Sequence, residues 1–179
     1  SLIYQLSGLL MPGITIVIDP IIALIEDQVQ GLKEHGIDRA IGIYGNMTKD
    51  PNTMKYVLSE IKKSQFHFIF MSPERLQIPS FRESLNQLTQ SSLVNLAVID
   101  EAHCVSEWGH DFRTAYLNLS KNIRENMKDK NNIPPPIVAL TGTASRAVLK
   151  DVLVELNIDS GSSDNVIRPS NFDREELNF

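Results

Sequence analysis

The chain has 179 residues, 42% of them hydrophobic and 22% charged, which suits a single globular domain. Its formal net charge is −5, whereas a protein that binds duplex DNA by itself usually has a basic surface. No apolar run reaches the roughly 18 residues that span a bilayer, which argues against a membrane protein. The single cysteine, Cys104, excludes an internal disulfide and fits a reducing, intracellular compartment.

Short apolar runs alternate along the chain with helical patterns. The runs are rich in Ile, Val and Phe, as in strands buried on both faces of a parallel sheet; they are Ile14–Ile18, Ala40–Tyr44, Phe66–Met71, Leu93–Ile99 and Pro136–Leu140. Helical patterns fall in Ser1–Leu10, Ile21–Glu34, Met54–Lys63, Phe81–Leu88, Leu117–Met127 and Ala147–Leu156. The alternation predicts βαβ units, and therefore an α/β domain with a mainly parallel sheet flanked by helices.

The ends of the chain suggest where the domain lies. A helical pattern at the very first residues suggests a domain truncated at its N-terminus. The stretch Ser160–Asp164, rich in Ser, Gly and Asp, marks the end of the compact part. We therefore expect one domain over residues 1–158 and a connector over residues 159–179.

Polar clusters follow four of the predicted strands at once. They are Asp19-Pro20, Ser72-Pro73-Glu74-Arg75, Asp100-Glu101-Ala102-His103 and Thr141-Gly142-Thr143-Ala144. Ligands of open parallel sheets bind beyond the carboxyl ends of the strands. If the sheet is parallel, the four clusters share one edge, and we expect them to form one site.

The acid pair Asp100-Glu101 is the sharpest of these signals. Two carboxylates at a strand tip can divide the work of nucleotide hydrolysis: one anchors Mg²⁺, largely through water, and the other orients or deprotonates the attacking water. The alternative is that the acids only cap the next helix. The preceding Leu-Ala-Val-Ile and the following Ala-His favour hydrolysis.

The residues around this pair resemble a known family. Asp100-Glu101-Ala102-His103 resembles motif II of superfamily 2 helicases, and Cys104–Arg113 resembles the aromatic-rich loop of RecQ DNA helicases. Three further segments resemble other helicase motifs in the family's order: Asp19–Val29 (motif Ia), Phe70–Leu76, and Ala139–Ala144 (motif III). The resemblance implies the first RecA-like domain, of the P-loop NTPase fold, of an ATP-dependent 3′–5′ DNA helicase acting in recombination and repair.

The resemblance also implies roles for individual residues. Catalysis falls to Asp100 and Glu101. Ser1, Asp100, Glu101 and His103 lie at the ATP site, with Ser1 and Asp100 holding Mg²⁺ largely through water. The residues implied in DNA contact and coupling are Trp108, His110, Asp111, Phe112, Arg113, Thr141, Thr143, Pro20 and Arg75.

Structural alternatives stand beside several of these roles. Trp108 and Phe112 offer faces for stacking single-stranded bases, but they could be core anchors. His103 could be a packing histidine, and Arg75 could pair with Glu74 or a helix acid. Thr141 and Thr143 could cap the helix that starts near Ser145.

Other parts of the family's motor are not in this chain. The family's Gly-Lys phosphate-binding loop would precede Ser1, and the second RecA-like domain carries the arginine finger. We therefore expect the isolated chain to bind ATP and DNA weakly and to hydrolyse no ATP measurably. One departure is Asp19-Pro20, where the family usually has Ser-Pro.

The expected partners are single-stranded or duplex DNA and the second RecA-like domain, in the nucleus or in the bacterial cytoplasm and nucleoid. Two other functions remain open. The first is an RNA helicase with the same Asp-Glu-Ala-His tetrad, against which Ser106–Arg113 argues. The second is a non-catalytic module that binds nucleic acid or a partner.

Overall fold

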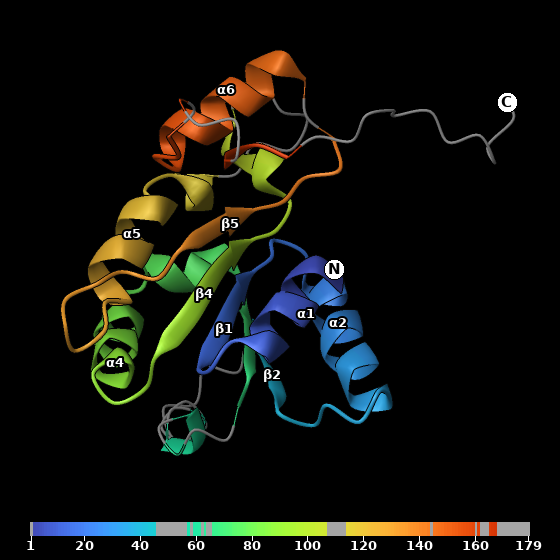
Figure 1. The fold of residues 1–179 in the computed structure, drawn as a ribbon, viewed down its shortest axis with the longest axis vertical. Coiled ribbons are helices and arrows are strands. Elements are labelled where there is room, and N and C mark those ends of the chain that lie inside the picture. Colours follow the sequence, from blue (N-terminus) through green and yellow to red (C-terminus); the bar gives the residue numbers. More distant parts are fainter. Residues whose placement is uncertain are drawn as a thin grey trace, which may run out of the picture.

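Five apolar runs form one parallel sheet in the computed structural model (Figure 1). The structure describes residues 2–45, 57, 59–61, 63, 66–106, 114–143, 145–159, 161 and 165–167. The strands are β1 (Ile14–Ile18), β2 (Ala40–Ile43), β3 (Phe68–Met71), β4 (Val94–Ile99) and β5 (Ile137–Ala139). Their order is β2-β3-β1-β4-β5, and every pair is parallel. The predicted sheet is confirmed, with strand bounds within two residues of those expected.

Helices lie on both faces of this sheet (Figure 1). One face carries α1 (Leu2–Leu10) and α2 (Ile22–Glu34). The other carries α4 (Pro79–Thr89), α5 (Leu119–Asn126) and α6 (Arg146–Glu155). Three short 3-10 helices complete the described elements: η2 (Pro73–Gln77), η3 (Ala102–Val105) and η4 (Thr114–Tyr116). The helix predicted over Met54–Lys63 lies largely outside the described residues.

The central strands feed two separate cores because successive side chains of a strand point to opposite faces. In β1, Ile14, Ile16 and Ile18 pack toward α4, α5 and α6, while Val17 packs toward α1 and α2. Phe68 and Phe70 of β3 join the second core. Strands β1, β3 and β4 are buried at every position, as the continuous apolar runs predicted.

Helix α1 approaches the sheet closely at Gly8. A Cβ atom there would lie 2.3 Å from the Thr15 hydroxyl oxygen and 2.8 Å from the Phe68 ring. Only glycine therefore fits at this contact without a shift of its neighbours. The close approach sets the position of Tyr4, one turn earlier in α1, whose side chain is buried.

None of the helices that the structure describes has the length and apolar character needed to cross a bilayer.

Candidate functional site

Backbone hydrogen bonds join the four polar-tipped strands into one continuous edge. The Asp19 amide donates to the Met71 carbonyl at 3.0 Å, and the Asp100 amide donates to the Ile18 carbonyl at 2.9 Å. Beyond β4, the Leu140 amide donates to Ile99, and the Ala102 amide donates back to Leu140 at 2.8 Å. Because β3, β1, β4 and β5 are consecutive neighbours, the predicted gathering of the four clusters on one edge is confirmed.

The chain turns sharply at the acid pair. Glu101 has φ 48° and ψ 44°, a left-handed backbone conformation that is uncommon for a residue with a side chain. The Asp100 carboxylate oxygen Oδ1 accepts a 3.0 Å hydrogen bond from the Glu101 amide and so supports the turn. Left-handed conformations of this kind cost about 1–3 kcal/mol and gather at functional sites. The turn sends the two carboxylates from adjacent positions into different environments.

His103 connects the acid pair to the tip of β5. Its Nδ1 atom lies 3.1 Å from Glu101 Oε2 and 3.1 Å from the Thr141 hydroxyl oxygen. The ring is half-buried, and 32% of the Glu101 side chain remains exposed. One imidazole nitrogen therefore faces a carboxylate and a hydroxyl from two neighbouring strands, which restrains both while leaving the carboxylate open to a ligand.

Thr141 belongs to the strand tip and not to the following helix. Its hydroxyl oxygen accepts from the Thr143 amide at 3.2 Å, closing a small turn. Helix α6 is capped by Ser145, whose hydroxyl accepts from the Val148 amide at 3.3 Å. The alternative that Thr141 and Thr143 cap this helix is therefore wrong, because Ser145 occupies the capping position.

A carboxyl group, that of Asp19, and a phenol, that of Tyr4, are buried near the acid pair. Asp19 is 2% exposed, and its carboxylate accepts from the Ile21 amide at 2.9 Å. Burial, together with the nearby charges of Asp100 and Glu101, raises the pKa of Asp19 to about 6, and the hydrogen bond from the Ile21 amide opposes this shift. Burial, with the charges of Asp100 and Asp19, also raises the pKa of Tyr4 above its usual value. Tyr4 therefore faces these carboxylates as a neutral phenol.

The residues expected at the DNA side are placed differently. Arg75 is only 6% exposed, and its guanidinium donates to the Gly45 carbonyl. Burial lowers the pKa of Arg75, with the charge of Glu74 opposing it. Pro20 is also buried. A DNA contact by Arg75 or Pro20 stays a prediction, and the burial of both side chains weighs against it.

Several predicted site residues lie outside the described part of the chain. They are Ser1, Trp108, His110, Asp111, Phe112 and Arg113.

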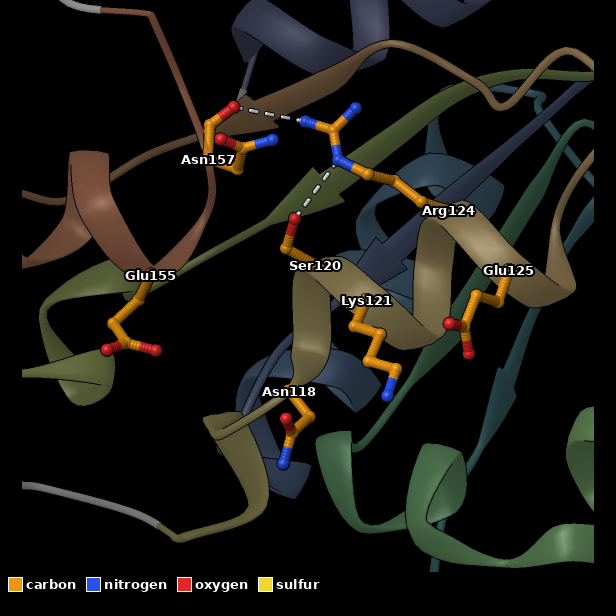
Figure 2. Close-up of a pocket in the computed structure, with 7 residues that line it drawn as sticks. All are labelled: Asn118, Ser120, Lys121, Arg124, Glu125, Glu155 and Asn157. Atoms are coloured by element: carbon orange, nitrogen blue, oxygen red, sulfur yellow. Dashed lines mark hydrogen bonds between the residues drawn. The ribbon is translucent and has the colours of Figure 1, made fainter.

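An open hollow lies away from the described site residues (Figure 2). It has a volume of about 350 Å³ between α5 and the end of α6, and none of the predicted site residues lines it. Arg124 occupies it, donating to the Ser120 hydroxyl at 3.2 Å and to the Asn157 carbonyl at 3.3 Å. A cation that bonds carbonyls at a helix C-terminus stabilises that helix end. The hollow therefore contains a structural contact between α5 and α6.

The sequence matches the family model of the DEAD/DEAH box helicases over residues 1–152. The chain belongs to this family. Curated relatives include the probable ATP-dependent DNA helicase RecS and the ATP-dependent DNA helicase RecQ of Bacillus subtilis, both 38% identical; these matches cover 95% and 100% of this chain. The ATP-dependent DNA helicase Q5 of Mus musculus is 39% identical over 88% of the chain. The resemblance to RecQ helicases is thereby confirmed.

The chain spans about a third of the length of the two bacterial relatives, 32% and 28%. Among solved structures, the Pyrococcus furiosus Hef helicase domain superposes with a TM-score of 0.54 at 17% identity, over 88% of this chain and 30% of that one. The DUF1998 helicase MrfA, bound to DNA and AMPPNP, gives 0.55 at 17% identity, over 86% and 20%. At such identities the likeness shows the fold alone, and it supports the RecA-like α/β architecture predicted for the domain.

Three features of this domain were not predicted from the sequence. Tyr4 lies within the helical pattern of residues 1–10, and its closeness to Asp100 depends on the approach at Gly8. Asp19 was visible as a polar tip, but its burial was not. Tyr116 donates to the Asp100 carbonyl from 16 residues away, a contact that no local pattern signals.

Proposed function

We propose that the chain supplies the hydrolytic residues of a RecQ-type, ATP-driven DNA helicase that unwinds DNA in the 3′–5′ direction. The observation that carries the proposal is the link from Glu101 through His103 to Thr141 at the carboxyl edge of the sheet. It joins a partly exposed carboxylate to the neighbouring strand tip, where a change at one can alter the other. An acid pair that only capped a helix would need no such connection.

The donor set fits Mg²⁺ and ATP. Mg²⁺ prefers hard oxygen ligands, keeps several waters, and commonly takes one or two carboxylates together with substrate phosphates. Asp100 offers a carboxylate at the edge, and Ser1 would add a hydroxyl. Among the described residues no group of three or more His, Cys, Asp or Glu side chains could hold a metal, so the phosphates and water would complete the coordination. When bound, Mg²⁺ would offset the negative charge of the phosphates.

The chain's own residues would then act on the attacking water. Glu101 would orient it or accept its proton as it attacks the terminal phosphate, which yields ADP and phosphate. His103 would hold the Glu101 carboxylate in place, and a movement of that carboxylate would alter the contact between His103 and Thr141. The buried phenol of Tyr4 would stay neutral near Asp100 and so add no charge beneath the site.

The remaining parts of the motor follow from the family. Residues 1–158 would form the first RecA-like domain, and residues 159–179 would lead toward the second. Residues 107–113 would couple DNA to hydrolysis, with Trp108 and Phe112 stacking on single-stranded bases at about 1–3 kcal/mol per base. The protein would act where DNA is found, in a nucleus or in bacterial cytoplasm.

The test is the ATPase rate of the full-length protein with and without single-stranded DNA, beside the Glu101→Gln variant. We expect DNA to stimulate hydrolysis more than RNA does. Loss of a general base lowers rates by about 10²–10⁴-fold, so Glu101→Gln should lose the DNA-stimulated rate by that factor. Glu155→Gln, which removes an exposed acid on α6, is the matched control and should keep it.

Stimulation by RNA alone would support an RNA helicase instead. A Glu101→Gln variant as active as the parent protein would remove Glu101 from the proposed role. The isolated 179-residue chain should show no measurable turnover.

A further inference from the structure

On both sides of residues 107–113, a buried side chain makes a hydrogen bond to a distant part of the chain. On the upstream side, Ser106 is 1% exposed, and its hydroxyl donates to the Asp151 carboxylate of α6 at 2.5 Å. That length is typical of a hydroxyl that donates to a carboxylate. The bond joins residues 45 positions apart and ties η3, which leaves the acid turn, to the helix that follows the tip of β5.

On the downstream side, Tyr116 returns to the acid turn itself. It closes η4, is 1% exposed, and donates from its hydroxyl to the Asp100 carbonyl at 3.1 Å. This carbonyl belongs to the peptide bond between Asp100 and Glu101. The hydroxyl thus holds the peptide from which the left-handed Glu101 projects.

We propose that Tyr116, together with the Ser106–Asp151 bond, positions the Asp100-Glu101 turn according to the state of the segment between them. The inference rests on the proposed function, in which residues 107–113 respond to DNA. That response would reach the acid turn through the described residues that flank the segment. At Tyr116 it acts on the Asp100 peptide, and at Ser106 it acts on α6, next to Thr141.

The position of the Tyr116 hydroxyl at the Asp100 carbonyl suits a role in coupling DNA binding to hydrolysis better than a role in overall stability. A left-handed residue occupies a small region of allowed backbone angles, so a modest rotation of the preceding peptide moves the Glu101 carboxylate. The Tyr116 hydroxyl restrains that rotation through one hydrogen bond. The Tyr116 ring belongs to the hydrophobic core on the α4, α5 and α6 face of the sheet, so its hydroxyl can be removed while the ring stays in place.

The experiment uses Tyr116→Phe in the full-length protein and compares its ATPase rate without DNA and with saturating single-stranded DNA. We expect the ratio of the two rates to fall about 2–10-fold, the range that removal of one hydrogen bond produces. The rate without DNA should change by less than about twofold, which is below that range. Tyr44→Phe, which removes a hydroxyl on the other face of the sheet, is the matched control and should keep the ratio.

The upstream anchor is tested by Ser106→Ala and by Ser106→Thr, which restores a hydroxyl. The alanine variant should lower the DNA stimulation, and the threonine variant should recover it. Asp151→Asn should weaken the bond, and the Ser106→Ala, Asp151→Asn double variant should be no worse than the stronger single variant. Glu155→Gln on the same helix is the charge-matched control.

A purely structural role would lower the rates with and without DNA together, along with the melting temperature, and that result would overturn the inference. So would normal DNA stimulation in both Tyr116→Phe and Ser106→Ala. If the parent protein itself shows no DNA stimulation, or if Glu101→Gln is fully active, it is the proposed function that fails.

Discussion

The carboxyl edge of the sheet has two halves that treat their polar residues differently. The open half, at β4 and β5, comprises Asp100, Glu101, His103 and Thr141, which are all half-buried. The closed half, at β1 and β3, comprises Asp19, Pro20 and Arg75, which are buried. The same topology produced both, since all four strands end at this edge.

The two halves also differ in what their side chains bond. In the open half, Asp100 and Thr141 accept from local backbone amides, but His103 also bonds side chains of two different strand tips, Glu101 and Thr141. In the closed half, Asp19 and Arg75 each bond a backbone group, the Ile21 amide and the Gly45 carbonyl. Side chains that satisfy backbone groups in the interior contribute to folding, and partly exposed ones remain available to a ligand. Changes in the closed half should therefore affect stability, and changes in the open half should affect activity.

The largest effect on stability is expected for Asp19→Asn. Because burial raises the pKa of Asp19 from 3.8 to about 6, the folded chain binds this proton more tightly than the unfolded chain. The contribution of Asp19 to stability is then greatest below pH 3.8 and falls by up to about 3 kcal/mol as pH rises through 6. Asparagine keeps the acceptor for the Ile21 amide and carries no charge. The variant should therefore be the more stable at pH 7, with a difference that shrinks toward pH 4.

Urea denaturation of the chain at pH 7 and at pH 4.5 measures this difference. Asp27→Asn, at an exposed position of α2, is the control and should change the midpoint little at either pH. Equal midpoints for Asp19→Asn and the parent chain at pH 7 would show that ionising the buried Asp19 carboxyl does not destabilise the fold. The claim that changes in the closed half affect stability would then fail for this residue.

The next largest effect is expected for Arg75→Met. Methionine keeps an apolar stem of similar length but leaves the Gly45 carbonyl without this donor, and an unsatisfied buried group costs about 1–3 kcal/mol. We expect a lower urea midpoint for the chain. In the full-length protein the slope of DNA affinity against salt should stay the same.

The salt slope separates a structural Arg75 from one that binds DNA. If Arg75 bound a DNA phosphate, its substitution would reduce the magnitude of the slope of log affinity against log salt by about 1. Such a reduction, with unchanged stability, would place Arg75 at the DNA and move it from the closed half to the open one.

The sequence predicted which strands form this edge better than it predicted which of the polar side chains are buried. Continuous apolar runs located β1, β3 and β4, and parallel topology then placed the polar tips together. No sequence pattern shows whether a polar side chain that follows a strand points outward or into the interior. Arg75 was expected near DNA for this reason, but the structure buries it. Contacts between distant segments, such as Tyr116 with Asp100, arise only when the whole fold is assembled. The helix cap illustrates a third limit, because Thr141, Thr143 and Ser145 are all good capping residues and only geometry selects Ser145.

The smallest effect, and the finest test of the open half, is expected for Thr141→Val. Valine keeps the shape of threonine but removes the hydroxyl that His103 and the Thr143 amide share. One hydrogen bond of this kind contributes about 0.5–1.5 kcal/mol, so the DNA-stimulated ATPase of the full-length protein should fall about 2–10-fold. Thr141→Ser, which restores the hydroxyl, should recover the rate. Because the side chain is partly exposed, the urea midpoint of the chain should change little. If the variant were less stable but kept its rate, Thr141 would have a structural role like that of the closed half. The two halves of the edge would then differ in burial but not in function.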